Sequence, residues 1–267
     1  GGLTWNPTGT MGASNPSRAG DIVIHPTNNQ ILWCATNNGI FKTTNAGTSW
    51  TQILSGINFS QGNIRLKPGD PTVVYASANN RFYRSTDTGS TFTAVTVSTV
   101  SSTRRLLIDV TAANNNYVYA LSVNNSNALN GIYRSTDSGT TFVATTTTPN
   151  ILGYQTDGSD TGSQAWYDLV IVADPTDANV IYTGGVNLWK SIDGGTTMNC
   201  VSYWVGPSGS IDGVHADQHA LEFSPHTNNL YNGNDGGLYY TPDGGVNWND
   251  ISSGLGIAQI YKINTRY

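Results

Sequence analysis

The sequence is poor in charge, in cysteine and in long apolar runs. Only 11% of its 267 residues are charged, Glu222 is the single glutamate, and Cys34 and Cys200 are the only cysteines. Helical proteins are rich in Glu, Lys, Ala and Leu, whereas this chain favours weak helix formers such as Thr, Asn and its 30 Gly. A net charge of −5 argues against a basic nucleic-acid surface. No apolar run reaches the roughly 18 residues of a membrane-spanning helix.

The polar bulk is uncharged and is interleaved with β-branched and aromatic residues, which favour strands. We therefore expect an all-β chain with no nucleic-acid partner and no transmembrane segment. The two cysteines have no metal-binding spacing, and each is interpreted as a buried, unpaired thiol.

An octapeptide recurs five times, at residues 43–50, 85–92, 135–142, 191–198 and 241–248. It begins with Ser or Thr, has Gly at its fifth position and ends on an aromatic residue in four copies. Its third residues are Asn45, Asp87, Asp137, Asp193 and Asp243. The copies lie 42 to 56 residues apart, a period typical of one four-stranded propeller blade.

The octapeptide has the chemistry of a hairpin turn. An Asp or Asn side chain accepts hydrogen bonds from backbone N–H groups of its own turn. The glycine two residues later supplies a positive φ. An aromatic residue precedes each copy by two positions, and these five are predicted core residues: Phe41, Tyr83, Tyr133, Trp189 and Tyr239.

The octapeptide resembles the Asp-box (BNR) repeat, S-x-D-x-G-x-x-[WF]. The resemblance implies a β-propeller of four-stranded antiparallel blades, as in sialidases, xyloglucanases and sortilin-type receptors. It implies little about function, because these boxes are scaffold turns. The expected blades are residues 19–54, 61–97, 104–146, 166–204 and 215–252.

Both ends of the chain match parts of a blade. Residues 1–5 repeat the end of an octapeptide, so residues 1–18 are expected to hold the outer strand of a preceding blade and a linker. Residues 258–267 are expected to form the first strand of a further blade. The chain is then a fragment of a larger propeller, and the remainder of that longer chain is its partner. The alternative is a six-bladed ring closed by its own termini.

The propeller topology places the octapeptide turns on one face and the longest irregular segments, 145–165 and 201–214, on the other. Binding residues favour such irregular loops. Trp166 and Trp204 lie in or beside these segments and are not explained by the repeat. They are candidates for stacking on sugar rings, but we favour the interpretation that they pack the insertions against the scaffold, because large aromatic residues are usually buried.

The segment from His215 to His219 begins an inner strand. Strand alternation would place His215, Asp217 and His219 on one face near the channel mouth. Three readings stay open: a hydrogen-bonded polar plug, which we favour, a catalytic or ligand-binding site with Asp217 as acid or base, and a transition-metal site. Asp168, at the start of another inner strand, adds to this mouth. Asp235, in the oxygen-rich segment 232–237, completes the candidate ligand-binding set.

Asp157 and Asp160 lie in an Asp-Gly-Ser-Asp-Thr-Gly-Ser segment that resembles an oxygen-rich cation loop. Calcium is the cofactor such a loop would hold, although it needs six to eight oxygen ligands and the spacing is not that of an EF-hand. Turns use the same residues, and this is the interpretation we favour. No other cofactor is expected.

Four segments are similar to large secreted bacterial proteins that carry Asp-box propellers and a type IX sorting domain: 149–160, 184–190, 214–219 and 233–237. The likeness implies an extracellular or cell-surface module for binding, adhesion or scaffolding, with a polysaccharide or a cell-surface protein as partner. The alternative is a glycoside hydrolase of the xyloglucanase type, which uses paired carboxylates. Asp217 would be one of the pair, and the family's other Asp falls in a segment where this chain has Asn37 and Asn38.

Overall fold

The computed structural model describes residue 4 and residues 9–12, 16–79, 81–97 and 103–255. The first sheet consists of β1 (Ala19–Ile24), β2 (Leu32–Thr36), β3 (Gly39–Thr43) and β4 (Thr51–Ser55). The second consists of β5 (Ile64–Leu66), β6 (Val74–Ala78), β7 (Arg81–Ser85) and β8 (Thr93–Val95). The third consists of β9 (Thr103–Val110), β10 (Val118–Asn124), β11 (Leu129–Ser135) and β12 (Val143–Thr146). The fourth consists of β13 (Val170–Ala173), β14 (Ile181–Gly184), β15 (Leu188–Ser191) and β16 (Asn199–Ser202). The fifth consists of β17 (Gln218–Phe223), β18 (Leu230–Asn234), β19 (Gly237–Thr241) and β20 (Asn249–Asp250).

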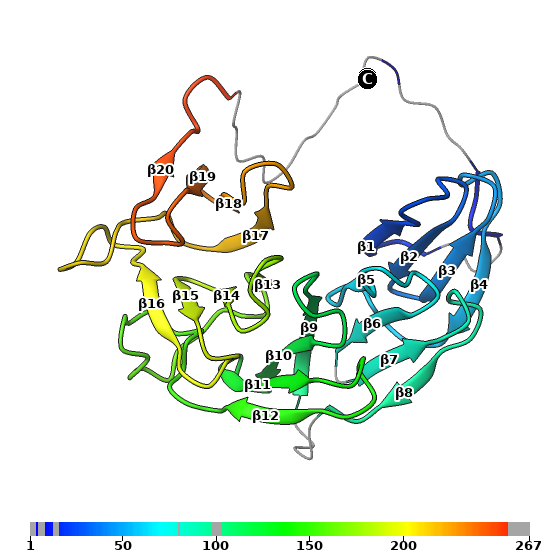
Figure 1. Cartoon of the computed structure of the whole chain (residues 1–267), viewed down its shortest axis with the longest axis horizontal. Coiled ribbons are helices and arrows are strands. Elements are labelled where there is room, and N and C mark those ends of the chain that lie inside the picture. The colour runs from blue at the N-terminus through cyan, green and yellow to red at the C-terminus, as the bar shows by residue number, and fades with distance from the viewer. Residues whose placement is uncertain (1–3, 5–8, 13–15, 80, 98–102, 256–267) are drawn as a thin grey trace, which may run out of the picture.

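Each sheet is an antiparallel meander in which neighbours in sequence pair in space. The five sheets form an arc, with the first strand of each sheet toward the centre and β1 and β17 at its two ends (Figure 1). These sheets are the blades of a β-propeller, so the predicted all-β propeller fold is confirmed. The partial blades expected at 1–18 and 258–267 fall largely or wholly outside the described residues. In the described part of the chain, no helix has the length and apolar character needed to cross a membrane.

The octapeptide turns form the hydrogen bonds that their residues predict. In the second copy, the Ser85 hydroxyl donates to Asp87 Oδ1 at 2.7 Å, and the same oxygen accepts the backbone N–H groups of Ser90 and Thr91 at 2.9 Å. Asn45 makes the turn as well, with its Oδ1 accepting the N–H of Ser49. The glycine two residues after each Asp or Asn has a positive φ: Gly47, Gly89, Gly139, Gly195 and Gly245.

The blades bury their largest side chains against one another. An aromatic residue of one blade's second strand shares a hydrophobic cluster with an aliphatic residue of the next blade's inner strand. The pairs are Trp33 with Ile64, Tyr75 with Ile108, Tyr119 with Ile171, and Tyr182 with Leu221. Because one small sheet cannot cover its own two faces, the contacts between blades form the core. The predicted core aromatics Phe41, Tyr83, Tyr133 and Trp189 are buried, whereas Tyr239 of the last blade is half-buried.

The two end faces of the arc carry side chains of the kind that are buried between neighbouring blades elsewhere in the structure. Ile22 occupies the register position of Ile64 and Ile108, because each pairs with the residue that follows a second-strand aromatic. Ile64 and Ile108 are fully buried, whereas Ile22 is 53% exposed. At the other end, Tyr231 is half-buried and stacks on Tyr240 with ring centroids 5.7 Å apart. Each end face therefore has the composition of an interface between blades.

This difference predicts unequal costs for one substitution at equivalent positions. Ile108→Ala should lower the free energy of unfolding by about 2–5 kcal/mol, because it opens a cavity between two blades. Ile22→Ala should cost less than about 0.5 kcal/mol in this chain, because its side chain is already exposed. Urea unfolding of the two variants and the wild type measures both values. Equal losses would show that Ile22 is covered in solution.

Candidate functional site

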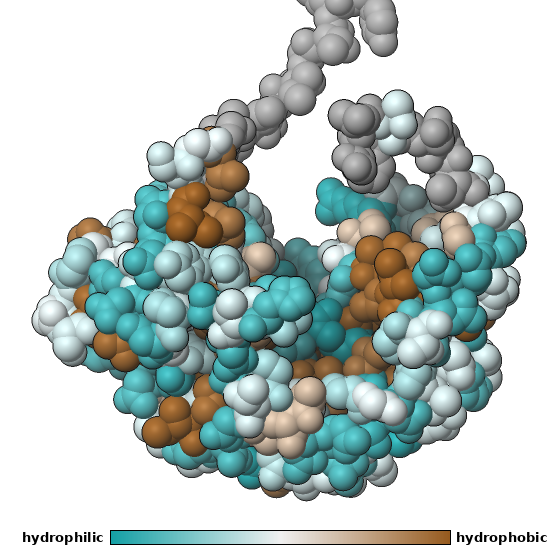
Figure 2. Space-filling model, turned by 45° about the horizontal axis from the view of Figure 1, so that its top comes forward, coloured by the Kyte–Doolittle hydropathy of each residue, from teal (hydrophilic) through white to brown (hydrophobic). Residues whose placement is uncertain are grey.

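The candidate site lies at the channel mouth opposite the octapeptide turns. It is built from two segments that lead into inner strands: residues 163–169 before β13 and residues 214–217 before β17. A third segment, between β18 and β19, contributes Asp235. Figure 2 shows the centre of the arc as a hollow with a hydrophilic floor and hydrophobic surface on the side of the first blades. A cavity of about 300 Å³ at this end of the channel includes Arg105 and His219 in its lining.

A glutamine amide connects two carboxylates from different blades. Gln164 Nε2 donates to Asp168 Oδ2 at 3.2 Å and also to Asp217 Oδ1. Asp168 is fully buried. Burial raises the pKa of Asp168 to about 7, aided by the negative charge of Asp217, while the bond from Gln164 opposes the rise. Asp168 is therefore poised to change its protonation state near neutral pH.

Asp217 lies just outside the strand that was expected to contain it. Strand β17 begins at Gln218, and Asp217 has a φ of +67°, so strand alternation does not relate His215, Asp217 and His219. That expectation was wrong because the backbone turns immediately before the strand. Burial and the charge of Asp235 raise the pKa of Asp217, against the opposing effect of the two histidines. The carboxyl group is half-buried and within reach of solvent.

Tyr167 ties the loop before β13 to the last blade. Its hydroxyl donates to Asp235, with oxygen–oxygen distances of 3.3 and 3.2 Å. Asp235 Oδ1 also lies 2.9 Å from His219 Nε2, and the His219 ring meets the Tyr167 ring edge to face at 4.8 Å. Trp166 lies beside Tyr167 with ring centroids 5.6 Å apart. Trp166 and Tyr167 are 51% and 41% exposed, which makes them an aromatic surface on this face.

Trp204 and His215 have different surroundings from the rest of the predicted set. The Trp204 indole N–H donates to the carbonyl of Tyr154 at 3.2 Å, and the side chain is 44% exposed. His215 packs over Gly236, where a Cβ atom would lie 2.3 Å from its ring. Trp166 and Trp204 are thus only about half buried, and Trp204 contacts the 145–165 insertion as the favoured packing interpretation expects.

The predicted cation loop has structural hydrogen bonds. Asp160 Oδ2 accepts the backbone N–H groups of Tyr154 and Gln155 at 2.9 and 2.7 Å, and Asp157 Oδ1 accepts that of Ser159. Across the described residues, no three His, Cys, Asp or Glu side chains come together as a metal site. This geometry supports neither the calcium prediction for Asp157 and Asp160 nor a transition metal at the two histidines.

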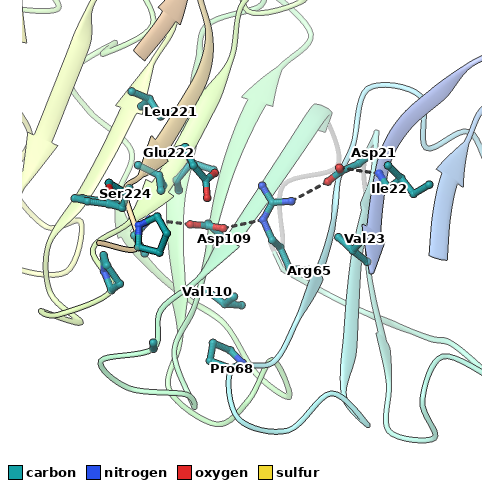
Figure 3. A pocket seen from close by; sticks show the side chains of 17 residues that line it. Asp21, Ile22, Val23, Arg65, Pro68, Asp109, Val110, Leu221, Glu222 and Ser224 are labelled. Carbon is teal, nitrogen blue, oxygen red and sulfur yellow. Dashed lines mark hydrogen bonds and ion pairs between the residues drawn. The ribbon is translucent and has the colours of Figure 1, made fainter. Parts of the chain in front are cut away.

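The channel itself contains an ion-pair network that the sequence did not reveal. Arg65 of β5 donates from Nη1 to Asp21 Oδ2 and from Nε to Asp109 Oδ1, both at 2.8 Å (Figure 3). Asp109 Oδ2 then accepts the N–H of Ala173 in the fourth blade. The network thus joins the inner strands of four successive blades. It lines a cavity of about 670 Å³, which also contains Glu222.

Glu222 carries the one glutamate carboxylate into the same cavity (Figure 3). Burial and the charges of Asp109 and Asp21 raise its pKa, and the Arg65 charge opposes the rise. Glu222 lies in strand β17, and its place beside a three-residue ion-pair network depends on contacts between blades.

The comparisons with known proteins agree with the propeller fold. The model of the sortilin family, described as sortilin, neurotensin receptor 3, matches residues 38–164. The GH74 xyloglucanase from Xanthomonas campestris superposes with a TM-score of 0.65 at 18% identity, covering 97% of this chain and 40% of that protein. An ancestral GH74 enzyme superposes with a TM-score of 0.63 at 18% identity, covering 94% of this chain and 32% of that one.

A third similar structure is the extracellular domain of a hybrid two-component system from B. thetaiotaomicron. Its TM-score is 0.59 at 17% identity, over 91% of this chain and 29% of that one. No curated protein matches the sequence. The chain spans about two fifths of the Xanthomonas campestris enzyme and a third of the ancestral GH74 enzyme. Identities this low show the fold that the proteins share.

The buried carboxyl of Asp168 predicts a measurable pH dependence of stability. Its pKa of about 7 lies above the ordinary value of about 3.9, so the folded state prefers the neutral form. This contribution is full below about pH 4 and is lost as the pH rises through 7. Asp168→Asn, neutral at every pH, should stabilise the chain at pH 8 by about 2 kcal/mol, or roughly 4–8 °C in Tm.

Thermal unfolding from pH 5 to pH 8 tests this prediction, with the exposed Asp157→Asn as a control of equal charge change. The gain in Tm should grow with pH for Asp168→Asn and stay flat for the control. Parallel pH profiles for wild type and Asp168→Asn would show that Asp168 is ionised in the folded state throughout.

Proposed function

We propose that this chain is part of an extracellular β-propeller that binds polysaccharide on the face formed by Trp166 and Tyr167. The observation that carries the proposal is an exposed aromatic pair held in place beside carboxylates. Aromatic rings stack on the apolar faces of sugars, while carboxylates and imidazoles accept and donate hydrogen bonds to hydroxyl groups. The bond from Tyr167 to Asp235 fixes the platform before a ligand arrives, which reduces the entropy lost on binding.

The structural neighbours support an extracellular setting and a larger protein. One is an extracellular domain, and two are GH74 enzymes of which this chain covers well under half. The exposed Ile22 face has the composition of a blade contact, and we infer that a further blade of the longer polypeptide packs on it. A cell-surface protein remains an alternative partner for the same aromatic face.

A hydrolase is the second candidate, favoured by the raised pKa of the accessible Asp217 carboxyl. A glycosidase of this kind needs two carboxylates that flank the scissile bond. Asp168, the carboxylate joined to Asp217 through Gln164, is fully buried and cannot touch a substrate. Asn37, at the position suggested by the family, accepts the backbone N–H groups of Ser17 and Arg18 and holds the chain that enters β1. These contacts favour binding over hydrolysis.

Binding is expected to depend on the exposed indole. Trp166→Ala should weaken binding to the polysaccharide recognised by the wild type by at least about tenfold, as for the loss of a central aromatic anchor. Affinity electrophoresis through gels that contain xyloglucan, mixed-linkage glucan, xylan or galactomannan measures the retardation. Val246→Ala removes an exposed apolar side chain from the opposite face and should leave the retardation unchanged.

No retardation of the wild type by any of these polymers would contradict the proposal. Release of reducing ends from the same polymers, abolished by Asp217→Asn, would establish the hydrolase instead.

A further inference from the structure

We infer that the ligand of the Trp166–Tyr167 face is a glycan with free amino groups, so that a protonated amine of the sugar meets the carboxylates of Asp217 and Asp235. This inference rests on the proposed function and names the class of glycan. Two separate observations carry it: the imbalance of charge around the aromatic pair, and a buried carboxylate oxygen that lacks a partner.

The charges that surround the aromatic pair are mostly negative. Asp217 accepts a hydrogen bond from Gln164, and Asp235 contacts His219, whose ring packs against Tyr167. The buried Asp168, whose pKa is raised to about 7, is not counted among these charges. His219 pairs with Asp235, and the hydrogen-bond partner of Asp217 is the neutral amide of Gln164. Asp217 therefore has no cationic hydrogen-bond partner among the described residues. The site therefore holds more negative charge than its own side chains neutralise.

Arg105 lines the cavity on this side of the channel, but its hydrogen bonds go to backbone carbonyls and not to the carboxylates. Its Nε donates to the carbonyl of Gln61 at 3.2 Å, and its Nη1 donates to the carbonyl of Ala165 at 3.0 Å. It lowers the pKa of Asp168 only as a minor influence behind burial. His215 is exposed and contacts the carbonyl of Ala216. Neither Arg105 nor His215 forms an ion pair with these carboxylates, so the mouth of the site stays acidic.

Asp168 supplies the independent observation. Its side chain is fully buried, and its Oδ1 atom makes no hydrogen bond with the described residues. Its other oxygen shares the Gln164 amide with Asp217, so the buried carboxylate faces the acidic group. Buried acceptors without partners are costly and rare in native proteins. Positive charge arriving at Asp217 would stabilise the ionised form of Asp168 behind it.

The aromatic surface suits the same cation. An ammonium group over an exposed indole or phenol ring is attracted by the ring's negative face. A uronic-acid polymer would bring its carboxylates against those of Asp217 and Asp235, which is unfavourable. A bare metal ion is not favoured either, since the described residues contain no three-ligand group. A sugar amine therefore satisfies both the platform and the carboxylates.

The experiment compares two oligosaccharides of equal length, glucosamine hexamer and N-acetylglucosamine hexamer, by calorimetry at pH 6, where the amines are charged. The wild type should bind the amino form about five- to tenfold more tightly. Raising the salt from 50 to 500 mM should reduce this preference, because exposed charge pairs are screened. Asp217→Asn and Asp235→Asn should each reduce it towards unity.

Asp250→Asn is the matched control, because it removes one exposed negative charge from the outer strand β20 and should keep the preference. Circular dichroism verifies that each variant is folded. If one of the two site variants fails to fold, the other still tests the inference. Equal affinity for both hexamers, or binding of the acetylated form alone, would overturn the amino-sugar inference and leave the proposed polysaccharide binding intact. Binding of neither hexamer, with binding of neutral polymers retained, overturns it too, whereas no glycan binding at all overturns both.

Poly-lysine of matched charge separates sugar recognition from general attraction to cations. It should bind more weakly than glucosamine hexamer, and Trp166→Ala should affect only the sugar. Equal binding of the two polycations would mean that the acidic mouth recognises charge alone, and would overturn the assignment of an amino sugar.

Discussion

The fold depends on burying one aromatic side chain of each blade beneath the next blade. The pairs of Trp33 with Ile64 and Tyr75 with Ile108 show the pattern, and it repeats to the end of the arc. In three blades a cation beside the third-strand aromatic secures the contact: Lys42, Arg84 and Lys190 each donate to the carbonyl that precedes a turn glycine in the following blade. Tyr240 occupies this position in the last blade, where no following blade is described. Much of the sparse positive charge is thus used between blades.

The sequence predicted the parts of the fold that local chemistry determines. A turn that satisfies its own backbone with Asp87 and a positive-φ glycine needs no distant partner, so its pattern is visible in eight residues. The Arg65 network was missed because Asp21 and Asp109 lie 44 residues away on either side. Nothing in the strand containing Arg65 distinguishes it from a solvent-exposed arginine until the blades are placed side by side.

The candidate site was predicted only in part, because several of its residues take their role from contacts between blades. Asp168, Asp217 and His219 were expected at one channel mouth because each lies near the start of an inner strand, and the structure brings them together with Asp235. Gln164 and Tyr167 were not predicted as site residues, although Gln164 lies within the irregular segment 145–165 and Tyr167 lies two residues after it. Their importance comes from reaching across to another blade. Strand alternation gave a wrong prediction for Asp217, because its positive φ interrupts the two-residue period of side-chain direction.

The distribution of aspartates explains why a chain with a scaffold so rich in carboxylates still has one distinct acidic site. The turn aspartates are satisfied by backbone N–H groups and hydroxyls, which lower the pKa of Asp87, Asp193 and Asp243. Asp21 and Asp109 share Arg65. Asp168 and Asp217 instead share one neutral amide, and their pKa values are raised rather than lowered. The scaffold neutralises its own charge locally, so the net charge offered to a ligand is concentrated where two blades meet at the mouth.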